Sequence, residues 1–563
     1  MNGYGFAQEL NMGNYLEKGS KDATPAVLEA LKDCKNQKSA KLVFPKGEYH
    51  FYGNFGVDKY CFVSNNDEGL KRIIFPILGM DNLTIDGQGS SFIFYGFVNP
   101  FVIENSKKIT LQNFSVDFAR PFHSEAIILA NRNDGLDVEI PENFPYRIKN
   151  NILEFTDGSP EQGMKTTVSS DLIYPYGHLL EFDTKKRETA FMASDYYLDN
   201  TPLVAEDLGG RKVRIFLKGL KGTVGNTLTF GAANRNYPGF VVSDCNDIVF
   251  NNITIFHSGG MGIVGQRTNN IKVEYCNVTP SPDRMVSTTA DATHFVNCTG
   301  KIELSHCLFE NQKDDATNIH GIYTPIAKQI SATEVIVELK HKQQFGFDYL
   351  KEGIEVEFVN SKSLITKGTA KVIKSERLNK NFTRVVFSIE IPNGIEVGDA
   401  ISELHDFAVV HIHDNIIRKN RARGMLLNCR GKTIVENNYF HSPGAALLFE
   451  GDAMYWYEQG GVSDCVIRNN VFDNCLFGVW GSAIIDVKAG IKEGFETSRY
   501  NKNIRITGNT FRTFDDALLL NIYCVDGLIW KDNKIEKTTD YSAVRSNISL
   551  FKIEHSDNVQ IIE

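Results

Sequence analysis

The sequence predicts an all-β protein, a right-handed parallel β-helix that carries two inserted small antiparallel β-barrel or sandwich modules. Three observations support this fold. An eight-residue phrase recurs at a basic step of about 23 residues, two long gaps in the repeat alternate apolar and polar residues as hairpins do, and a short helix precedes the repeat. The 46 Gly, 38 Phe and 21 Tyr, with only 16 Pro, suit a β-rich chain with many tight turns.

The N-terminal segment is expected to cap the solenoid. Residues 22–31 (DATPAVLEAL) predict a short helix, because Pro25 stands in the first turn, where a missing N–H leaves no bond unmade. KLVFPKGEYHF, from Lys41, should then open the first strand. A helix placed here covers the exposed end of the core, which repeat folds need. We therefore assign residues 1–120 to the cap and the first coils.

The repeated phrase is apolar at its first, third and eighth positions and often has Asn or Cys sixth. Its nine copies begin at Ile109, Ile248, Ile271, Ile302, Val410, Thr433, Cys465, Ile504 and Leu528. Three of the intervals between starts equal the basic step or exceed it by one residue, and the longer ones fit the same coil with an added loop. Coils stack about 4.8 Å apart, and an Asn at a recurrent turn can form a ladder between them. A β-sandwich with accidental periodicity is the alternative, which nine copies in one phase disfavour.

Two long gaps, from Ile109 to Ile248 and from Ile302 to Val410, interrupt the repeat. Their sequences alternate in hairpin fashion, as VRIFLKGL does in the first gap and IEVEFVN and TRVVFSIEI do in the second. We therefore assign residues 121–230 and 322–405 to the two inserted modules. Residues 231–321 form β-helix coils between them, and 406–563 form the C-terminal coils.

Composition excludes several classes of function. The formal charge of -9, from 60 Lys and Arg against 69 Asp and Glu, disfavours a nucleic-acid partner, which needs a basic face. No apolar run approaches the roughly 18 residues of a membrane span. The ten cysteines form no CxxC pair, and Cys276 and Cys307 sit within apolar strands, so reduced and buried cysteines are expected.

The N-terminus MNGYGFAQEL shows neither a basic region nor an apolar core, so no signal peptide is visible. We expect a periplasmic or secreted protein if a leader was removed, and a cytoplasmic protein otherwise.

Three aspartates form the sharpest candidate site. TTADATHF holds Asp291, and QKDDATNIHG holds Asp314 and Asp315. Asp314 follows Asp291 by one basic step of the repeat, so we expect Asp291 to stack beside Asp314, with Asp315 next to both. Clustered carboxyls raise at least one pKa, and a glycosidase needs one protonated carboxyl and one carboxylate that activates water. The alternative is that acidic pairs only occupy turns, which is one interpretation of Asp515 and Asp516.

Polar residues at one phase of the repeat predict a continuous wall, as a sugar-binding groove requires. Gln266, His320 and Asn428 each lie at the same distance from the start of their copy, and Glu450 lies one residue closer to the start of its own. Trp456 follows this wall, and aromatic faces pack against sugar C–H groups. The predicted substrate-binding residues are Arg267, His294, His320, Arg423, Asn428, Glu450 and Trp456.

The order of a lone Asp and then a paired Asp one coil later resembles the inverting β-helical hydrolases of the polygalacturonase type. The segments ADATHF, KDDATNIHG, HSPGAALLFEGDAMYWYEQGG and SDCVIRNNVF, with the two insertions, resemble more closely glycoside hydrolase family 110, bacterial exo-acting α-1,3-galactosidases. This resemblance covers most of the chain. It implies release of terminal α-1,3-linked galactose, from blood-group-B-like or linear α-galactosyl ends, with inversion of configuration.

The resemblance also implies roles for the three acids. Asp314 would be the general acid, and Asp291 and Asp315 would hold the water as base. Polygalacturonases usually carry Gly before the paired Asp, where this chain has Lys313, so pectin is a less expected substrate. Inverting enzymes hold acid and base about 6.5 to 9.5 Å apart, so side-chain direction must widen the spacing of about 4.8 Å between adjacent coils.

Other interpretations of the same fold stay open. A polysaccharide lyase would use a Lys, Arg, Tyr or His base, and a glycan-binding β-helix would leave its sugar intact.

His411, His413 and Asp414 could bind a metal, but no tetrahedral ligand set accompanies them, so surface positions are favoured. We predict no metal and no cofactor, and a glycan or oligosaccharide as partner. The protruding modules could mediate a homo-oligomer.

Overall fold

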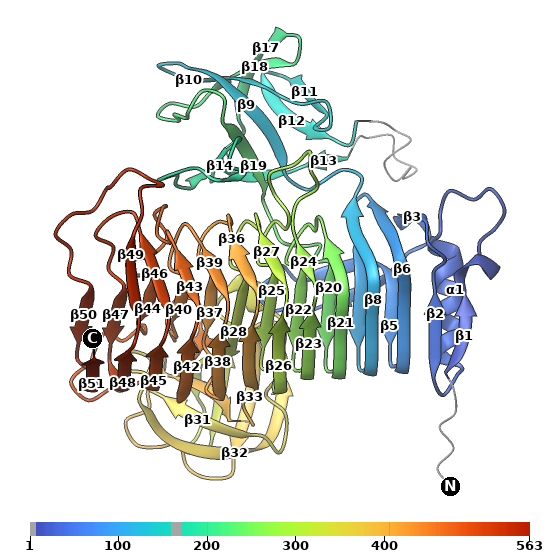
Figure 1. Cartoon of the computed structure of the whole chain (residues 1–563). Helices are drawn as coiled ribbons and strands as arrows, with labels where there is room; N and C mark the ends of the chain where they lie inside the picture. Colours follow the sequence, from blue (N-terminus) through green and yellow to red (C-terminus); the bar gives the residue numbers. More distant parts are fainter. Residues whose placement is uncertain (1–6, 159–171, 200, 405, 563) are drawn as a thin grey trace.

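The computed structural model describes residues 7–158, 172–199, 201–404 and 406–562. The chain winds into a parallel β-helix that lies lengthwise in Figure 1, with its N-terminal coils at the right and its C-terminal coils at the left. The first inserted module stands above this solenoid, and the second lies below it. The predicted fold class is confirmed.

Each coil gives two short strands, separated by a corner, to one long parallel sheet and one strand to a second parallel sheet. Before the corner lie β2 (Ala40–Val43), β6 (Asp81–Tyr95), β8 (Lys107–Phe118), β21 (Asn246–Ile255), β23 (Asn269–Glu274), β26 (Thr299–Ser305), β35 (Val409–His413), β38 (Lys432–Glu436), β42 (Asp464–Arg468), β45 (Asn501–Thr507), β48 (Val525–Lys531) and β51 (Asp557–Ile562). After the corner lie β3 (Glu48–Tyr52), β24 (Asn277–Val278), β27 (Leu308–Glu310), β36 (Ile416–Arg418), β39 (Tyr439–His441), β43 (Val471–Asp473), β46 (Thr510–Thr513) and β49 (Lys534–Lys537), while β6, β8 and β21 run through it.

The second sheet carries the candidate site. It contains β4 (Val57–Cys61), β5 (Gly69–Leu78), β7 (Asn99–Glu104), β20 (Phe240–Ser243), β22 (Ile263–Gln266), β25 (Thr293–Val296), β28 (Thr317–Ile322), β37 (Met425–Leu427), β40 (Leu447–Phe449), β44 (Ile485–Val487), β47 (Leu520–Tyr523) and β50 (Phe551–Glu554). Two pairings in this sheet are antiparallel: β4 with β5, and the short strand β41 (Glu458–Gln459) with the end of β28.

The strand register reproduces the sequence repeat. Ile248 pairs with Ile109 on one side and with Ile271 on the other, and Ile271 pairs with Ile302. The remaining starts, from Val410 to Leu528, follow in the same order and register. The apolar first and third positions are buried in one continuous core, because inward side chains of a coil are covered only by the coils beside it.

The N-terminal helix α1 (Thr24–Lys35) lies at the end of the solenoid, as predicted, and contributes Val27 and Leu31 to the core. Asp22 accepts a hydrogen bond from the backbone N–H of Thr24 through Oδ1, at 2.8 Å. The expectation that the first strand follows the helix was wrong, because β1 (Gln8–Asn11) precedes it and pairs in parallel with β2. Single 3₁₀ turns are η1 (Met12–Asn14), η2 (Gly53–Phe55) and η3 (Lys342–Gln344).

An asparagine ladder runs along the corner of the C-terminal coils, as the sixth position of the repeat predicts. Asn415, Asn438, Asn470, Asn509 and Asn533 stack in order, and in each neighbouring pair the side-chain oxygen of the later asparagine accepts an N–H of the earlier side-chain amide, at 2.9 to 3.0 Å. The residue before each asparagine takes a positive φ, from 55° to 66°. The ladder satisfies backbone groups that the corner would otherwise leave unpaired.

Replacing one rung should destabilise the whole solenoid. Asn438→Ala removes the side-chain donor to the Ile412 carbonyl and the acceptor for Asn415, both buried. We expect a loss of about 2 kcal/mol or more in the free energy of unfolding, because each orphaned buried partner costs about 1 to 3 kcal/mol. Urea unfolding measures it. Lys432→Ala, at an exposed position of the same coil, is the control and should change stability by less than about 0.5 kcal/mol.

The first module is an antiparallel sheet inserted between β8 and β20, with its own core around Val138, Phe155 and Phe230. Its strands are β9 (Ser124–Asn131), β10 (Gly135–Glu139), β11 (Tyr146–Lys149), β12 (Ile152–Thr156), β13 (Ile173–Tyr174), β14 (Tyr176–Asp183), β15 (Glu188–Thr189), β16 (Tyr196–Tyr197), β17 (Val204–Gly209), β18 (Lys212–Phe216) and β19 (Thr227–Ala232).

The second module is a closed antiparallel barrel inserted between β28 and β35. It consists of β29 (Thr324–Gln329), β30 (Glu334–Glu338), β31 (Glu355–Val359), β32 (Thr366–Arg377), β33 (Phe382–Phe387) and β34 (Ala400–Leu404). Val335, Phe358 and Val372 belong to its core. The second module leaves the solenoid directly after β28, which follows Asp314 and Asp315, whereas the first leaves one coil earlier than β22 and reaches back to Lys313 through Thr229.

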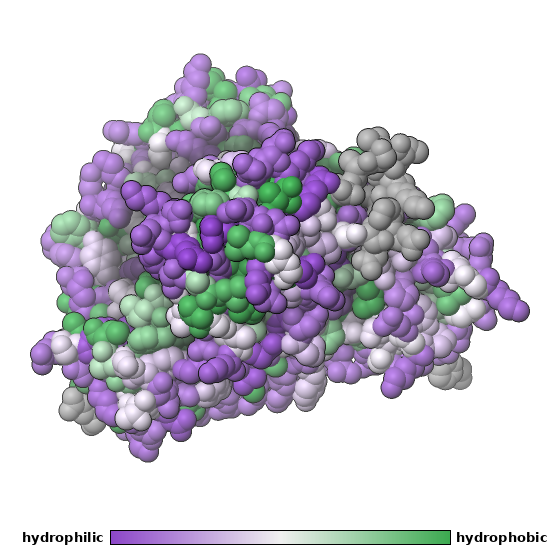
Figure 2. Space-filling model, turned by 90° about the horizontal axis from the view of Figure 1, so that it is seen from above, coloured by the Kyte–Doolittle hydropathy of each residue, from purple (hydrophilic) through white to green (hydrophobic). Residues whose placement is uncertain are grey.

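The helices within the described residues are too short and too polar to cross a membrane. The face seen from above in Figure 2 is mostly hydrophilic, with small scattered hydrophobic patches. All ten cysteines are free and buried, as expected.

Candidate active site

A pocket lies over the second sheet and holds all three candidate aspartates. It is an open hollow of about 570 Å³, measured together with the solvent at its mouth. It is lined by Asn65, Arg235, Asp291, His294, Asp314, Asp315, Asn318, Gln343, Arg423, Leu426, Glu450, Gly451, Asp452, Trp456 and Glu458. We call it the first pocket.

The register of the second sheet places the acids. Thr293 pairs with Thr317, and Thr317 pairs with Met425. Asp291, Asp315 and Arg423 each stand two residues before one of these paired residues, so they occupy the same position on three adjacent coils. The expectation that Asp291 stacks beside Asp314 was wrong by one residue, because the step between these strands of the second sheet is one residue longer than the basic step.

The three acids are buried and close together. Asp291, Asp314 and Asp315 are 3%, 8% and 2% exposed, and one carboxylate oxygen of each lies within 4.8 Å of the others. Three guanidiniums face them. Arg423 binds Asp315 through Nε and Nη2, at 2.9 and 2.7 Å. The alternative that these acids only occupy turns does not fit this arrangement.

Asp314 lies between two further arginines. Arg235 Nη2 donates to its Oδ2 at 2.7 Å, and Arg421 Nη1 donates to its Oδ1 at 2.9 Å. These cations outweigh burial and lower the pKa of Asp314. In the free protein Asp314 is therefore ionised, which is the opposite of the resting state of a general acid.

Burial, with the negative charge of nearby acids, raises the pKa of Asp291 and of Asp315 to about 7. A chain of hydrogen bonds decides where the proton of this pair sits. Gly321 offers a carbonyl oxygen 2.6 Å from His320 Nδ1, so Nδ1 carries the hydrogen. His320 Nε2 then accepts from His294 Nε2 at 3.0 Å.

His294 Nδ1 is left as an acceptor, and Asp291 Oδ2, 2.7 Å away, can donate to it only when protonated. Burial lowers the pKa of His294 to about 4 and lowers that of His320, so both rings are neutral, as this chain requires. The network therefore assigns the proton to Asp291 and leaves Asp315 ionised against Arg423.

A second pocket adjoins the first on the side of Asp314. It is lined by Asp67, His178, Tyr197, Ala232, Ala233, Asn234, Arg235, Thr289, Lys313, Asp314, Lys342, Gln343 and Arg421, and we call it the adjoining pocket. Arg235, Asp314 and Gln343 border both pockets, whereas Asp291 and Asp315 border only the first.

Lys313 explains one departure from the polygalacturonase pattern. Its side chain is buried and reaches the first module, where Nζ lies 3.3 Å from Thr229 Oγ1. Burial lowers the pKa of Lys313 to about 7. The lysine thus ties the loop before Asp314 to the inserted module, a contact for which a glycine has no side chain.

Four of the predicted substrate-binding residues line the first pocket: His294, Arg423, Glu450 and Trp456. Burial raises the pKa of Glu450. The other three expectations need correction. Arg267 lies outside, because it binds Asp244 at 2.6 Å and its guanidinium stacks over Phe347 of the second module.

His320 and Asn428 do share the repeat phase of Gln266, but they lie beneath the pocket wall. His320 contacts His294, and Asn428 Oδ1 accepts the backbone N–H of Glu450 at 2.7 Å. Gln266 is covered by the N-terminal loop, since its side chain binds the backbone of Phe62 and Ser64. The predicted wall is not continuous, because the apolar Val296 stands between Gln266 and His320, and covering loops bury its polar members.

Several lining residues were not predicted from the sequence. Arg235 follows the last strand of the first module, Gln343 belongs to the second module, and Asn65 comes from the loop between β4 and β5. Asn318 was identifiable in principle, because it pairs with His294 one coil earlier. Asp515 and Asp516 bind Arg545 and Lys537 instead and do not line either pocket.

Family models match both inserted modules. Residues 124–228 match the GLAA-B beta-barrel domain I, and residues 334–401 match the GLAA-B beta-barrel domain II. A family 28 exopolygalacturonase of Yersinia enterocolitica, a solved structure, is 10% identical with a TM-score of 0.38, over 98% of this chain and 78% of that chain. This similarity is too weak to carry an argument.

Curated relatives match over nearly the whole chain. Alpha-1,3-galactosidase A of Shewanella woodyi is 37% identical, over 95% of this chain and 87% of its own. Alpha-1,3-galactosidase B of Bacteroides thetaiotaomicron is 31% identical, over 92% and 84%, and that of Phocaeicola vulgatus is 32% identical, over 98% and 94%. The chain therefore belongs to the bacterial α-1,3-galactosidase family, glycoside hydrolase family 110, and is a glycosidase.

Proposed function

We propose that the protein releases terminal α-1,3-linked galactose from glycans, such as blood-group-B-like or linear α-galactosyl ends, as an exo-acting and inverting hydrolase. The observation that carries this proposal is the position of Asp314 at the border of two pockets, with Asp291 and Asp315 on one side only. The bond to be cleaved lies between two sugars, so the glycosidic oxygen is expected at the border between the first pocket and the adjoining pocket.

The terminal galactose is placed in the first pocket. Arg423, Glu450 and Asn318 offer donors and acceptors for its hydroxyl groups, and the Trp456 ring offers an apolar face. The rest of the glycan is placed in the adjoining pocket. The first pocket then holds only the terminal sugar, so each cleavage releases one galactose from the chain end, which is exo action.

Asp314 is proposed as the general acid because it lies at the border of the two pockets, and position relative to the cleaved bond is considered before the resting pKa in such an assignment. Its ionised resting state requires that the substrate displace Arg235 or Arg421 from it, so that the carboxyl can take up a proton. Asp315 is proposed as the base. It is ionised against Arg423 and lies beside protonated Asp291, and the two hold the attacking water.

Inversion rests on the resemblance to inverting β-helical hydrolases. Such enzymes keep acid and base about 6.5 to 9.5 Å apart, to make room for water. The nearest oxygens of the three acids lie within 4.8 Å of one another. The proposal therefore includes a turn of the Asp314 side chain toward the adjoining pocket when the glycan binds.

Chromatography of the products tests the substrate class. Galα1-3Gal and a blood-group-B trisaccharide should each release galactose, whereas Galα1-4Gal and polygalacturonate should not. Ultraviolet absorbance from polygalacturonate would favour a lyase, and galacturonate release would favour a polygalacturonase. Intact sugars throughout, with tight binding of Galα1-3Gal, would favour a glycan-binding protein and overturn the proposal.

Trp456 is expected to act in substrate binding. The side chain is 42% exposed at the pocket rim, with its ring centroid 4.9 Å from that of His341. Trp456→Ala should raise KM for Galα1-3Gal about tenfold, a loss of about 1.4 kcal/mol, with kcat within about threefold of the wild type. Steady-state kinetics measure both. Phe55→Ala is the control, because Phe55 is 61% exposed and does not line either pocket.

A further inference from the structure

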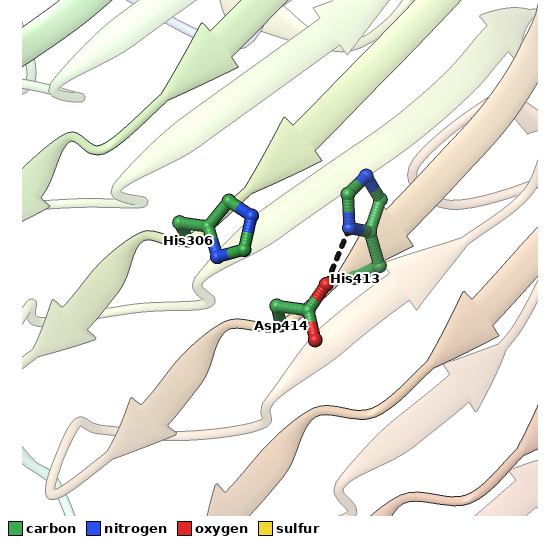
Figure 3. A group of neighbouring side chains, drawn as sticks. All are labelled: His306, His413 and Asp414. Atoms are coloured by element: carbon green, nitrogen blue, oxygen red, sulfur yellow. Dashed lines mark hydrogen bonds and ion pairs between the residues drawn. The ribbon is translucent and has the colours of Figure 1, made fainter.

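Three side chains of two adjacent coils meet on the outer surface of the long sheet, away from the first pocket. His306 follows β26, His413 ends β35, and Asp414 comes next. β26 and β35 pair in parallel, with Ser305 opposite His413. Figure 3 shows the His306 ring standing opposite the His413–Asp414 pair.

The donor atoms of these residues are close enough to share one ion. One nitrogen of each imidazole and one oxygen of Asp414 all lie within 4.8 Å of one another. His413 Nδ1 is 2.7 Å from Asp414 Oδ2. The centroids of the two imidazole rings are 5.8 Å apart, at 83°. A zinc ion with bonds of about 2.0 to 2.2 Å fits this triangle after a small movement of the side chains.

The donor set favours zinc over calcium or magnesium. Imidazole nitrogens suit zinc and its neighbours, whereas calcium and magnesium prefer oxygen ligands only. Three protein ligands leave a fourth tetrahedral position for water. Glu303 Oε1 lies 3.7 Å from His413 Nε2, on the side of the ring away from Asp414. A carboxylate in this place commonly orients a metal-bound histidine.

The described residues hold one other such group, the three aspartates of the first pocket. There, Arg235, Arg421 and Arg423 already neutralise the carboxylates. No guanidinium pairs with His306, His413 or Asp414 among the described contacts. The surface group is therefore the better cation site of the two.

We propose that His306, His413 and Asp414 form a binding site for Zn²⁺ that joins two coils where the chain leaves for the second module. The ion takes the place of the hydrogen between His413 Nδ1 and Asp414 Oδ2, and the His413 ring then carries its hydrogen on Nε2, toward Glu303. The site is independent of the proposed glycosidase chemistry. Because it links two coils across the whole inserted module and binds only the folded chain, it stabilises the fold.

Calorimetric titration of Zn²⁺ into chelator-treated protein without an affinity tag tests the site. We expect about one bound ion per chain, and loss of this binding in His306→Asn and His413→Asn. His555→Asn is the matched control, because His555 is an exposed histidine with φ 47°, close to the 53° of His306, and Asn tolerates this conformation. Its zinc binding should equal that of the wild type.

Two further readouts keep the proposal falsifiable if a variant folds poorly. X-ray absorption at the zinc edge should show two imidazoles and oxygen ligands, and zinc should raise the unfolding temperature of the wild type but not of His306→Asn. Absence of stoichiometric binding, or binding that persists in both histidine variants, would overturn the site. So would binding that inhibits galactose release in His306→Asn, since it would place the ion on the aspartates.

Discussion

Asp314→Asn should lower kcat on Galα1-3Gal by about a thousandfold or more, within the range that positioned acids contribute. Asn cannot give a proton to the leaving oxygen, yet its side-chain oxygen can still accept from Arg421 or Arg235, which bind Asp314 at 2.9 and 2.7 Å. The fold should therefore persist. Steady-state kinetics, with thermal unfolding of the same sample, measure the loss.

An activated substrate separates the acid from other roles. α-Galactosyl fluoride needs no proton to expel its leaving group, so Asp314→Asn should lose less than about tenfold on it. A variant of the base should lose activity on both substrates. Equal losses of Asp314→Asn on the disaccharide and the fluoride would contradict the assignment of Asp314 as general acid.

Asp315→Asn should lose about a thousandfold or more on both substrates, and Asp291→Asn should lose less. The reason is the position of the shared proton. The chain from Gly321 through His320 and His294 ends on Asp291, which is therefore protonated, while Asp315 is the ionised partner. An Asn amide at 291 can donate to His294 Nδ1 as the protonated carboxyl does.

Stability against pH tests this proton assignment separately. Asp291 has a pKa raised from 3.8 to about 7 by burial, so between these pH values the unfolded chain loses this proton while the folded chain keeps it. Stability contributed at this site therefore falls as the pH rises from about 4 to 7. Asp291→Asn lacks this loss and should be at least as stable as the wild type at pH 7.5, by urea unfolding.

The opposite order would change the mechanism. If Asp291→Asn lost more activity than Asp315→Asn while remaining folded, Asp291 would be the base. The hydrogen-bond chain through His294 would then serve to orient an ionised Asp291.

Periodicity made much of the fold predictable. The repeat starts at Ile248, Ile271 and Ile302 pair in the structure as their spacing indicates, because in a solenoid each coil contacts only its neighbours. Asn438 and Asn470 stack for the same reason. The same periodicity brought Asp291 and Asp315 together, with an error of one residue where a loop changed the local step.

The rest of the site comes from parts of the chain that no repeat constrains. Arg235 and Gln343 enter from the two modules, and their approach depends on how each module packs on the solenoid. His320 has the repeat phase of a wall residue, yet it is buried, because β41 and its neighbours cover the sheet there. His306 and His413 are separated by the second insertion, yet their proximity was identifiable in principle, because the repeat copies that begin at Ile302 and Val410 pair in the structure.

Proton NMR of Galα1-3Gal hydrolysis tests the central claim most directly. Wild-type protein should release β-galactose first, which then equilibrates with the α form, and Asp314→Asn should release almost none. This result would establish α-1,3-galactosidase activity, inversion and the need for Asp314 together. Early α-galactose would contradict inversion, and no galactose from the wild type would contradict the proposed function itself.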